Sequence, residues 1–180
     1  MGPDEARIIL AEAELICSSE AIDFAIARLA REITARLQDA HPVVLTVMGG
    51  AVIFAGQLLP KLLFPLECDY LHATRYGNSI VGSELSWLTE PHTPLVGRTV
   101  LVLDDILDEG ITLAAIRKRL LDLGADSCWT AVLAEKETGS PKPIAADFKG
   151  VQLPNRYVFG CGMDVGGAWR NLPAIYALKT

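Results

Sequence analysis

The sequence has no surplus of positive charge. Its 180 residues include 16 lysines and arginines against 22 aspartates and glutamates, which leaves a net charge of −6. An acidic protein is poorly suited to bind a nucleic-acid backbone or an anionic membrane, because both carry negative charge. We therefore expect no nucleic acid and no membrane as partner, whereas a small anionic ligand could still be held by a local pocket.

Cysteines are few and far apart, and none belongs to a CxxC pair. The four are Cys17, Cys68, Cys128 and Cys161. This spacing indicates neither a zinc site nor a disulfide framework, and it is typical of a reducing compartment. The first residues are acidic and lack the basic stretch and long apolar run of a signal peptide. We therefore expect a cytoplasmic location.

The chain also lacks internal repeats, low-complexity tracts and linkers, so we expect a single domain over residues 1–180. Hydrophobic residues make up 51%, enough for a sizeable core. The run from Pro42 to Pro60 is 19 residues long and free of charge. It has the length of a membrane span, but Gly49-Gly50 interrupts it and prolines bound it, which favours a buried strand, a turn and a helix.

Apolar patterning predicts alternating helices and strands. Ser18-Ser19 can cap a helix whose apolar residues recur at helical spacing up to Leu37. Near-continuous apolar runs at 43–48, 99–103 and 131–134 are typical of strands buried on both faces. Other helices are expected at 4–16, 51–63 and 113–123, and other strands at 65–73, 84–88, 148–153, 157–160 and 174–178. The alternation predicts an α/β fold with a mostly parallel central sheet flanked by helices.

Four carboxylates follow the strongest predicted strand and precede a helix: Asp104, Asp105, Asp108 and Glu109. Open α/β sheets bind ligands at this edge. Because like charges repel, this run favours a cation such as Mg²⁺ or a sugar with several hydroxyls nearby. A solvated acidic loop that merely caps a helix is the simpler alternative.

Gly110 and Thr112 extend this run toward the helix. Glycine permits a left-handed turn, and the Thr112 hydroxyl could cap the helix or meet a phosphate. Backbone amides of residues 109–112 at a helix N-terminus would form an anion site. The segment thus offers acids for hydroxyls or metal and then amides for a phosphate, a combination that suits a phosphorylated sugar.

The segment LVLDDILDEGIT, residues 101–112, resembles the phosphoribosyl-pyrophosphate motif of the type I phosphoribosyltransferases. Only Glu109 departs from the pattern, where threonine or serine is usual. The resemblance implies the fold of that family, with a small hood formed by the chain termini. It also implies a phosphoribosyl site made of Asp104, Asp105, Asp108, Glu109, Gly110, Ile111 and Thr112, with Asp104 and Asp105 at the ribose hydroxyls or Mg²⁺.

The last third resembles the hypoxanthine-guanine branch of the family, in which a lysine, an F-V-V-G strand, an aspartate and an arginine follow in this order. Lys136, Tyr157 and Val158 would then bind the purine, through its 6-oxo group, its ring face and its edge. Asp164 would hold Mg²⁺ directly or through water, and Arg170 would bind pyrophosphate. Taken singly, the two cations could be surface residues and the tyrosine a core residue.

Two loops complete the resemblance. Residues 47–50 match the pyrophosphate loop, with Met48 and Gly49 as contacts and a cis peptide expected between Val47 and Met48. Met48 stands where lysine or arginine is common. Residues 74–79 resemble the lid, with Arg75 and Tyr76 over the reacting centre, although an ordinary surface hairpin is the alternative.

The resemblance implies a Mg²⁺-dependent purine-salvage enzyme that acts as a homodimer or homotetramer. It would join phosphoribosyl pyrophosphate to a 6-oxopurine, hypoxanthine or guanine, with Asp108 as general base or acid at purine N7. A xanthine-preferring transferase is one alternative, because Lys136 suits any 6-oxopurine. A non-catalytic regulator that senses nucleotide or phosphoribosyl pyrophosphate on the same fold is the other.

Overall fold

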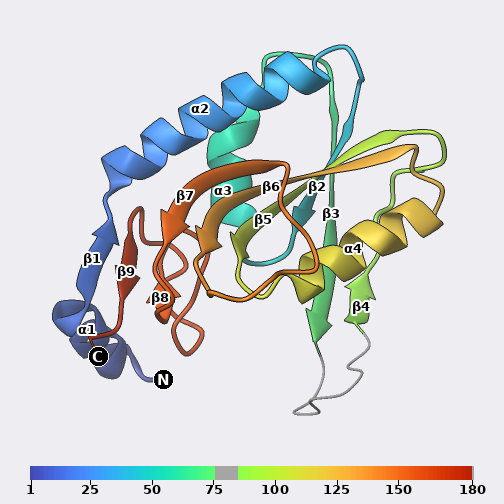
Figure 1. Cartoon of the computed structure of the whole chain (residues 1–180). Coiled ribbons are helices and arrows are strands. Elements are labelled where there is room, and N and C mark those ends of the chain that lie inside the picture. The colour runs from blue at the N-terminus through green and yellow to red at the C-terminus, as the bar shows by residue number, and fades with distance from the viewer. Residues whose placement is uncertain (76–84, 180) are drawn as a thin grey trace.

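The computed structural model describes residues 1–75 and 85–179. In this part of the chain a six-stranded sheet has the order β4-β3-β2-β5-β6-β7 (Figure 1). These strands are β4 (Leu85–Thr89), β3 (Glu67–Arg75), β2 (Val43–Val47), β5 (Thr99–Leu107), β6 (Ser127–Lys136) and β7 (Phe148–Leu153). All neighbouring pairs are parallel except β3 and the edge strand β4. The predicted α/β fold with a mostly parallel sheet is confirmed.

Helices cover both faces of this sheet. Helices α2 (Ser19–Leu37) and α3 (Val52–Leu58) share one apolar core with β2, β5 and β6, and a short 3₁₀ turn (Leu59–Lys61) continues α3. Helix α4 (Ile111–Asp122) packs on the other face (Figure 1). The predicted cap of α2 is present, since the Ser18 hydroxyl accepts from the amide of Ala21 at 3.4 Å. No helix of the described residues has the length and apolar character needed to cross a bilayer.

The two ends of the chain form a second, three-stranded sheet of order β1-β9-β8. It contains β1 (Glu14–Cys17), β9 (Ile175–Ala177) and β8 (Val158–Phe159), and α1 (Pro3–Glu12) precedes it. The prediction of one helix over 4–16 is therefore wrong beyond residue 12. Residues 14–17 pair instead with β9, a partner about 160 residues away that local periodicity cannot reveal.

Strand β5 is longer than the apolar pattern predicts. Its pairing with β6 continues through Asp104 opposite Val132 to Leu107 opposite Glu135. Asp104 and Asp105 therefore lie inside the strand, not past its end, because a neighbouring strand continues to satisfy their backbone. Gly110 has the predicted left-handed conformation, with φ of +80°, and it is itself the N-cap of α4. Thr112 lies within the first turn, so its predicted role as cap is wrong.

Candidate active site

A cavity of about 470 Å³ opens at the carboxyl edge of the central sheet. The acidic segment at the end of β5, the loop after β2 and Arg170 meet around it, as the sequence predicts. Its lining comprises Val47, Met48, Gly49, Gly50, His72, Ala73, residues 104–113 and Arg170. His72 and Ala73 had not been predicted, although β3 runs parallel to β2 and must end at the same edge.

Asp104 and Asp105 place two adjacent half-buried carboxyl groups in this cavity. Burial, and next the charge of Asp105, raise the pKa of Asp104 well above its usual value. Burial also raises the pKa of Asp105, against the opposing effects of backbone hydrogen bonding and the nearby Arg170 charge. A hydroxyl donor or a cation beside this pair would offset the cost of ionising it.

Glycines allow the backbone to approach Asp105 closely. A β-carbon added at Gly50 would overlap the Asp105 carboxylate, and one at Gly162 would overlap the carbonyl oxygen of Gly50. Gly162 also has φ of +105°, which disfavours any side chain. The absence of side chains at Gly50 and Gly162 therefore leaves room for the Asp105 carboxylate and the Gly50 carbonyl. The sequence predicts Gly50 only as part of the pyrophosphate loop and assigns no role to Gly162, because the two glycines are more than a hundred residues apart.

The turn from Asp108 to Thr112 is where the sequence predicts an anion site. Gly110 starts α4, and the first amides of a helix have no partner within the helix. Ile144 and Leu107 pack against the open side of Gly110, and a β-carbon there would lie 3.3 Å from each. Glu109 is exposed at the rim of the cavity. The turn thus presents amides at the positive end of a helix dipole.

Asp108 and Lys136 come together from two neighbouring strand ends. The ammonium Nζ of Lys136 lies 2.6 Å from Oδ2 of Asp108. The Asp108 side chain is 45% exposed and lines the cavity, whereas that of Lys136 is 12% exposed and is not part of the lining. A hydrogen-bond acceptor that lines the cavity therefore has a hydrogen-bond donor directly beside it.

Tyr157, Val158 and Asp164 do not line this cavity, but Asp164 is joined to it through Arg170. The Arg170 guanidinium lies 2.6 Å from Oδ1 of Asp164 and donates to the carbonyl of Gly162 at 2.6 Å. The Tyr157 hydroxyl donates to the backbone carbonyl of Asp164 at 3.2 Å, and its side chain is otherwise largely exposed. Val158 is buried in β8.

Asp164 already has a partner on each carboxylate oxygen. Oδ1 faces Arg170, and Oδ2 accepts from the amide of Gly167 at 2.7 Å. Its predicted place as a metal ligand therefore stays a prediction. Across the described ranges 1–75 and 85–179, no three histidine, cysteine or acidic side chains converge as a metal-binding group.

The loop after β2 contains the expected cis peptide one residue later than predicted. The cis bond joins Met48 to Gly49, so the prediction of Val47–Met48 is wrong. The Met48 amide donates to the carbonyl of Leu71 at 2.8 Å, which ties the loop to β3. Arg75 ends β3, while Tyr76 and the rest of the predicted lid lie outside the described residues.

Comparison with known proteins places the chain in a family. A model described as "Phosphoribosyl transferase domain" matches residues 14–165. The chain is 34% identical to the hypoxanthine-guanine phosphoribosyltransferase of Bacillus subtilis, over 92% of this chain and 93% of that protein. It is 35% identical to the hypoxanthine-guanine-xanthine phosphoribosyltransferase of Tritrichomonas foetus, over 86% and 85% of the two chains.

The structural comparison agrees with the sequence match. A solved structure of a hypoxanthine-guanine-xanthine phosphoribosyltransferase superposes with a TM-score of 0.84 at 32% identity, covering 93% of this chain and 97% of that one. A hypoxanthine phosphoribosyltransferase from Staphylococcus aureus, at 24% identity, shares the fold with a TM-score of 0.89. Because the family model spans most of its length and its relatives match most of both chains, this chain belongs to the phosphoribosyltransferases.

Proposed function

We propose that this chain transfers the 5-phosphoribosyl group of phosphoribosyl pyrophosphate to N9 of hypoxanthine or guanine. The products are IMP or GMP and pyrophosphate. Two relatives named for hypoxanthine and guanine match the chain over most of its length and most of their own, which supports the proposal. The observation that carries it is the pair of Asp108 and Lys136 at the edge of a cavity with an anion-binding turn.

This pair complements one edge of a 6-oxopurine. The base presents an acceptor, the oxygen at position 6, next to a donor, the N–H at position 7. Lys136 supplies only donors and an ionised Asp108 only acceptors, 2.6 Å apart. In the proposed complex Lys136 binds the oxygen and Asp108 binds the N7 proton. Tyr157 stacks on the ring and the Val158 backbone contacts its other edge.

The cavity accommodates the second substrate in the same proposal. Asp104 and Asp105 bind the ribose hydroxyls. The 5-phosphate lies on the turn formed by Asp108, Glu109, Gly110, Ile111 and Thr112. Met48 and Gly49 contact the pyrophosphate through their backbone, and Arg170 pairs with its oxygens. Arg75 and Tyr76 belong to the proposed lid that excludes water.

The proposed reaction is one displacement at C1 of the ribose. The bond from purine N9 to C1 forms, and the bond from C1 to the pyrophosphate oxygen breaks, with its electron pair leaving on pyrophosphate. Asp108 accepts the N7 proton, so the purine product is neutral. Arg170 stabilises the negative charge that develops on the departing group.

Mg²⁺ fits the side chains of this site. Asp104 and Asp105 are adjacent carboxyl groups whose pKa values are raised by burial, so a nearby cation would favour their ionised forms. Mg²⁺ is commonly held by one or two carboxylates together with substrate phosphates, which needs no cluster of three protein ligands. When bound, it would neutralise charge on the pyrophosphate. We propose Asp104 and Asp105 as its ligands, with Asp164 contributing directly or through water.

A turnover assay with phosphoribosyl pyrophosphate, Mg²⁺ and each base tests the proposal. Nucleotide formation from hypoxanthine and guanine is expected. Xanthine belongs in the same panel, because the Tritrichomonas foetus relative names it. Tight nucleotide binding without turnover would instead indicate a sensor and contradict the proposal. We further propose that the protein is cytoplasmic and forms a homodimer or homotetramer. Light scattering after size-exclusion chromatography measures the mass of the assembly and so tests its oligomeric state.

A further inference from the structure

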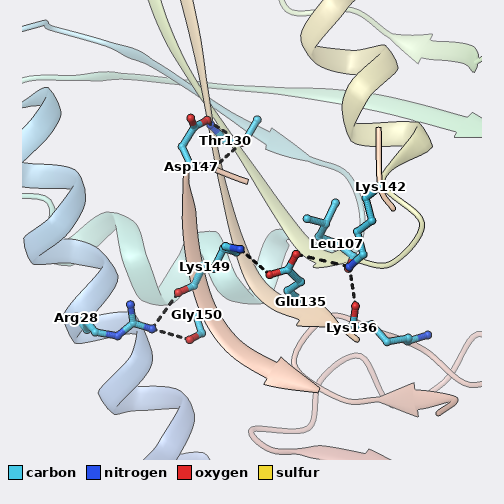
Figure 2. A network of polar contacts seen from close by, with 9 residues as sticks. All are labelled: Arg28, Leu107, Thr130, Glu135, Lys136, Lys142, Asp147, Lys149 and Gly150. Atoms are coloured by element: carbon cyan, nitrogen blue, oxygen red, sulfur yellow. Dashed lines mark hydrogen bonds and ion pairs between the residues drawn. The ribbon is translucent and has the colours of Figure 1, made fainter. Parts of the chain in front are cut away.

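Lys142 lies in the connection between β6 and β7, and its ammonium group is almost enclosed. Nζ donates to the carbonyl oxygen of Lys136 at 2.6 Å and to that of Leu107 at 3.0 Å. It also lies 3.6 Å from Oε1 of Glu135, and its side chain is only 12% exposed. An ammonium group has three protons to donate, and three acceptors surround this one (Figure 2).

The two carbonyls that Lys142 binds are at the ends of the strands that carry the Asp108–Lys136 pair. Leu107 ends β5 and directly precedes Asp108, and Lys136 ends β6. Figure 2 shows the Lys142 side chain reaching both strand ends while the Lys136 side chain extends away from it. Lys142 therefore holds the backbone on both sides of the pair without contacting either charged group of the pair.

The same segment supports the anion-binding turn by packing. The β-carbon of Lys142 and the side chain of Ile144 border Gly110, at 3.5 and 3.3 Å from the position of an added β-carbon. The stem of Lys142 thus contacts the turn, and its charged end ties the two strand ends. A substitution that removes only the ammonium group therefore tests the hydrogen bonds without removing the packing of the stem.

The charge of Lys142 is balanced by a carboxylate that it shares with a second lysine. Glu135 is 18% exposed and lies between Lys142 and Lys149, with Lys149 Nζ at 2.9 Å from Oε2. Lysines are almost never buried without such pairing. Lys149 is 47% exposed and its ammonium group shares Glu135 with Lys142. The two lysines therefore differ in what else they bind, which makes Lys149 a matched control.

We propose that Lys142 is a positioning residue for the phosphoribosyl transfer, fixing the spacing of Asp108 and Lys136 through the carbonyls of Leu107 and Lys136. This inference rests on the proposed function. Its consequence is selective. Loss of the ammonium group should misplace the groups that bind the purine, while the phosphate turn keeps the stem against which it packs. Small misplacements of reacting groups can lower rates by up to about a hundredfold.

The test compares Lys142→Met, Lys142→Arg and Lys149→Met by steady-state kinetics, at a temperature where thermal melts show each variant folded. Lys142→Met should lower kcat about tenfold or more and raise KM for hypoxanthine, with KM for phosphoribosyl pyrophosphate near the wild-type value. Lys142→Arg should recover most of the loss, and Lys149→Met should resemble wild type. If Lys142→Met does not fold, Lys142→Gln replaces it with the same expectation.

The outcomes separate this inference from the proposed function. If wild type makes no nucleotide, the proposed function fails, whatever the variants do. If wild type is active and Lys142→Met matches Lys149→Met in kcat and both KM values, Lys142 does not position the pair. An equal rise in both KM values would also overturn the inference, because it would indicate a general loss of structure.

Discussion

Asp108 is the residue on which the proposed chemistry depends most directly. It pairs with Lys136, and its side chain is open to the cavity. Asp108→Asn retains the shape but removes the base that accepts the N7 proton. Loss of a general acid–base group usually costs about a hundredfold or more in rate. We expect kcat to fall by at least that factor in a steady-state assay.

Asp122 offers a matched control for that substitution. Its carboxylate also lies 2.6 Å from a lysine ammonium, that of Lys118, but the pair is exposed on α4 and outside the cavity lining. Asp122→Asn should leave kcat within about twofold of wild type, since exposed ion pairs contribute little. Equal kcat for wild type and Asp108→Asn would show that Asp108 is only a loop residue.

At the scale of elements, the close approach between the loop after β2 and the segment before Asp164 should be sensitive to size. Gly162→Ala places a methyl group onto the Gly50 carbonyl at φ of +105°. We expect a loss of at least about 1 kcal/mol in unfolding free energy from the backbone conformation alone, and more from the overlap. Urea unfolding measures it.

Gly139→Ala separates these two contributions. Gly139 also has a positive φ, +72°, but an added β-carbon meets nothing within 4 Å. It should therefore show only the conformational cost. If Gly162→Ala and Gly139→Ala destabilise the protein equally, the overlap with Gly50 has no energetic weight, and the loop has room to move away from Asp105.

Strands and helices with strong local patterns could be predicted, whereas elements defined by distant partners could not. The runs at 99–103 and 131–134 are apolar enough to indicate buried strands by themselves. Residues 14–17 carry no such signal, and only pairing with β9 makes them a strand. For the same reason β5 continues through its two aspartates, because β6 runs beside it.

The candidate site divides in the same way. The acids, the glycine turn and Arg170 could be predicted from motif order, and they do line one cavity. His72 could have been found from the parallel order of β2 and β3. The supporting contacts of Gly50, Gly162 and Lys142 could not be predicted. They join segments that are distant in the sequence, and no sequence motif links these segments.

At the scale of the whole molecule, we expect the proposed reaction to require a divalent cation. The chain carries a net charge of −6, and the cavity gathers four carboxylates near the proposed pyrophosphate. Such charges repel strongly at short range unless a cation lies between them. EDTA in excess should abolish nucleotide formation, and added Mg²⁺ should restore it. Full turnover in excess EDTA would contradict the assignment of Mg²⁺ to Asp104 and Asp105.

The central claim is that Lys136 and Asp108 select a 6-oxopurine. Adenine carries an amino group at position 6, so the Lys136 ammonium would face another donor in a largely desolvated place. Sites built on a substrate hydrogen bond can reject the wrong partner by about 10⁴–10⁵ in catalytic efficiency. The lysine should therefore determine the choice of base.

The most direct measurement is kcat/KM for hypoxanthine, guanine and adenine on wild type and on Lys136→Ala. We expect wild type to use hypoxanthine and guanine and to discriminate against adenine by orders of magnitude. Lys136→Ala should lose efficiency with both 6-oxopurines and discriminate less sharply. Wild-type efficiency with adenine equal to that with hypoxanthine would contradict the role of Lys136, and with it the proposed choice of substrate.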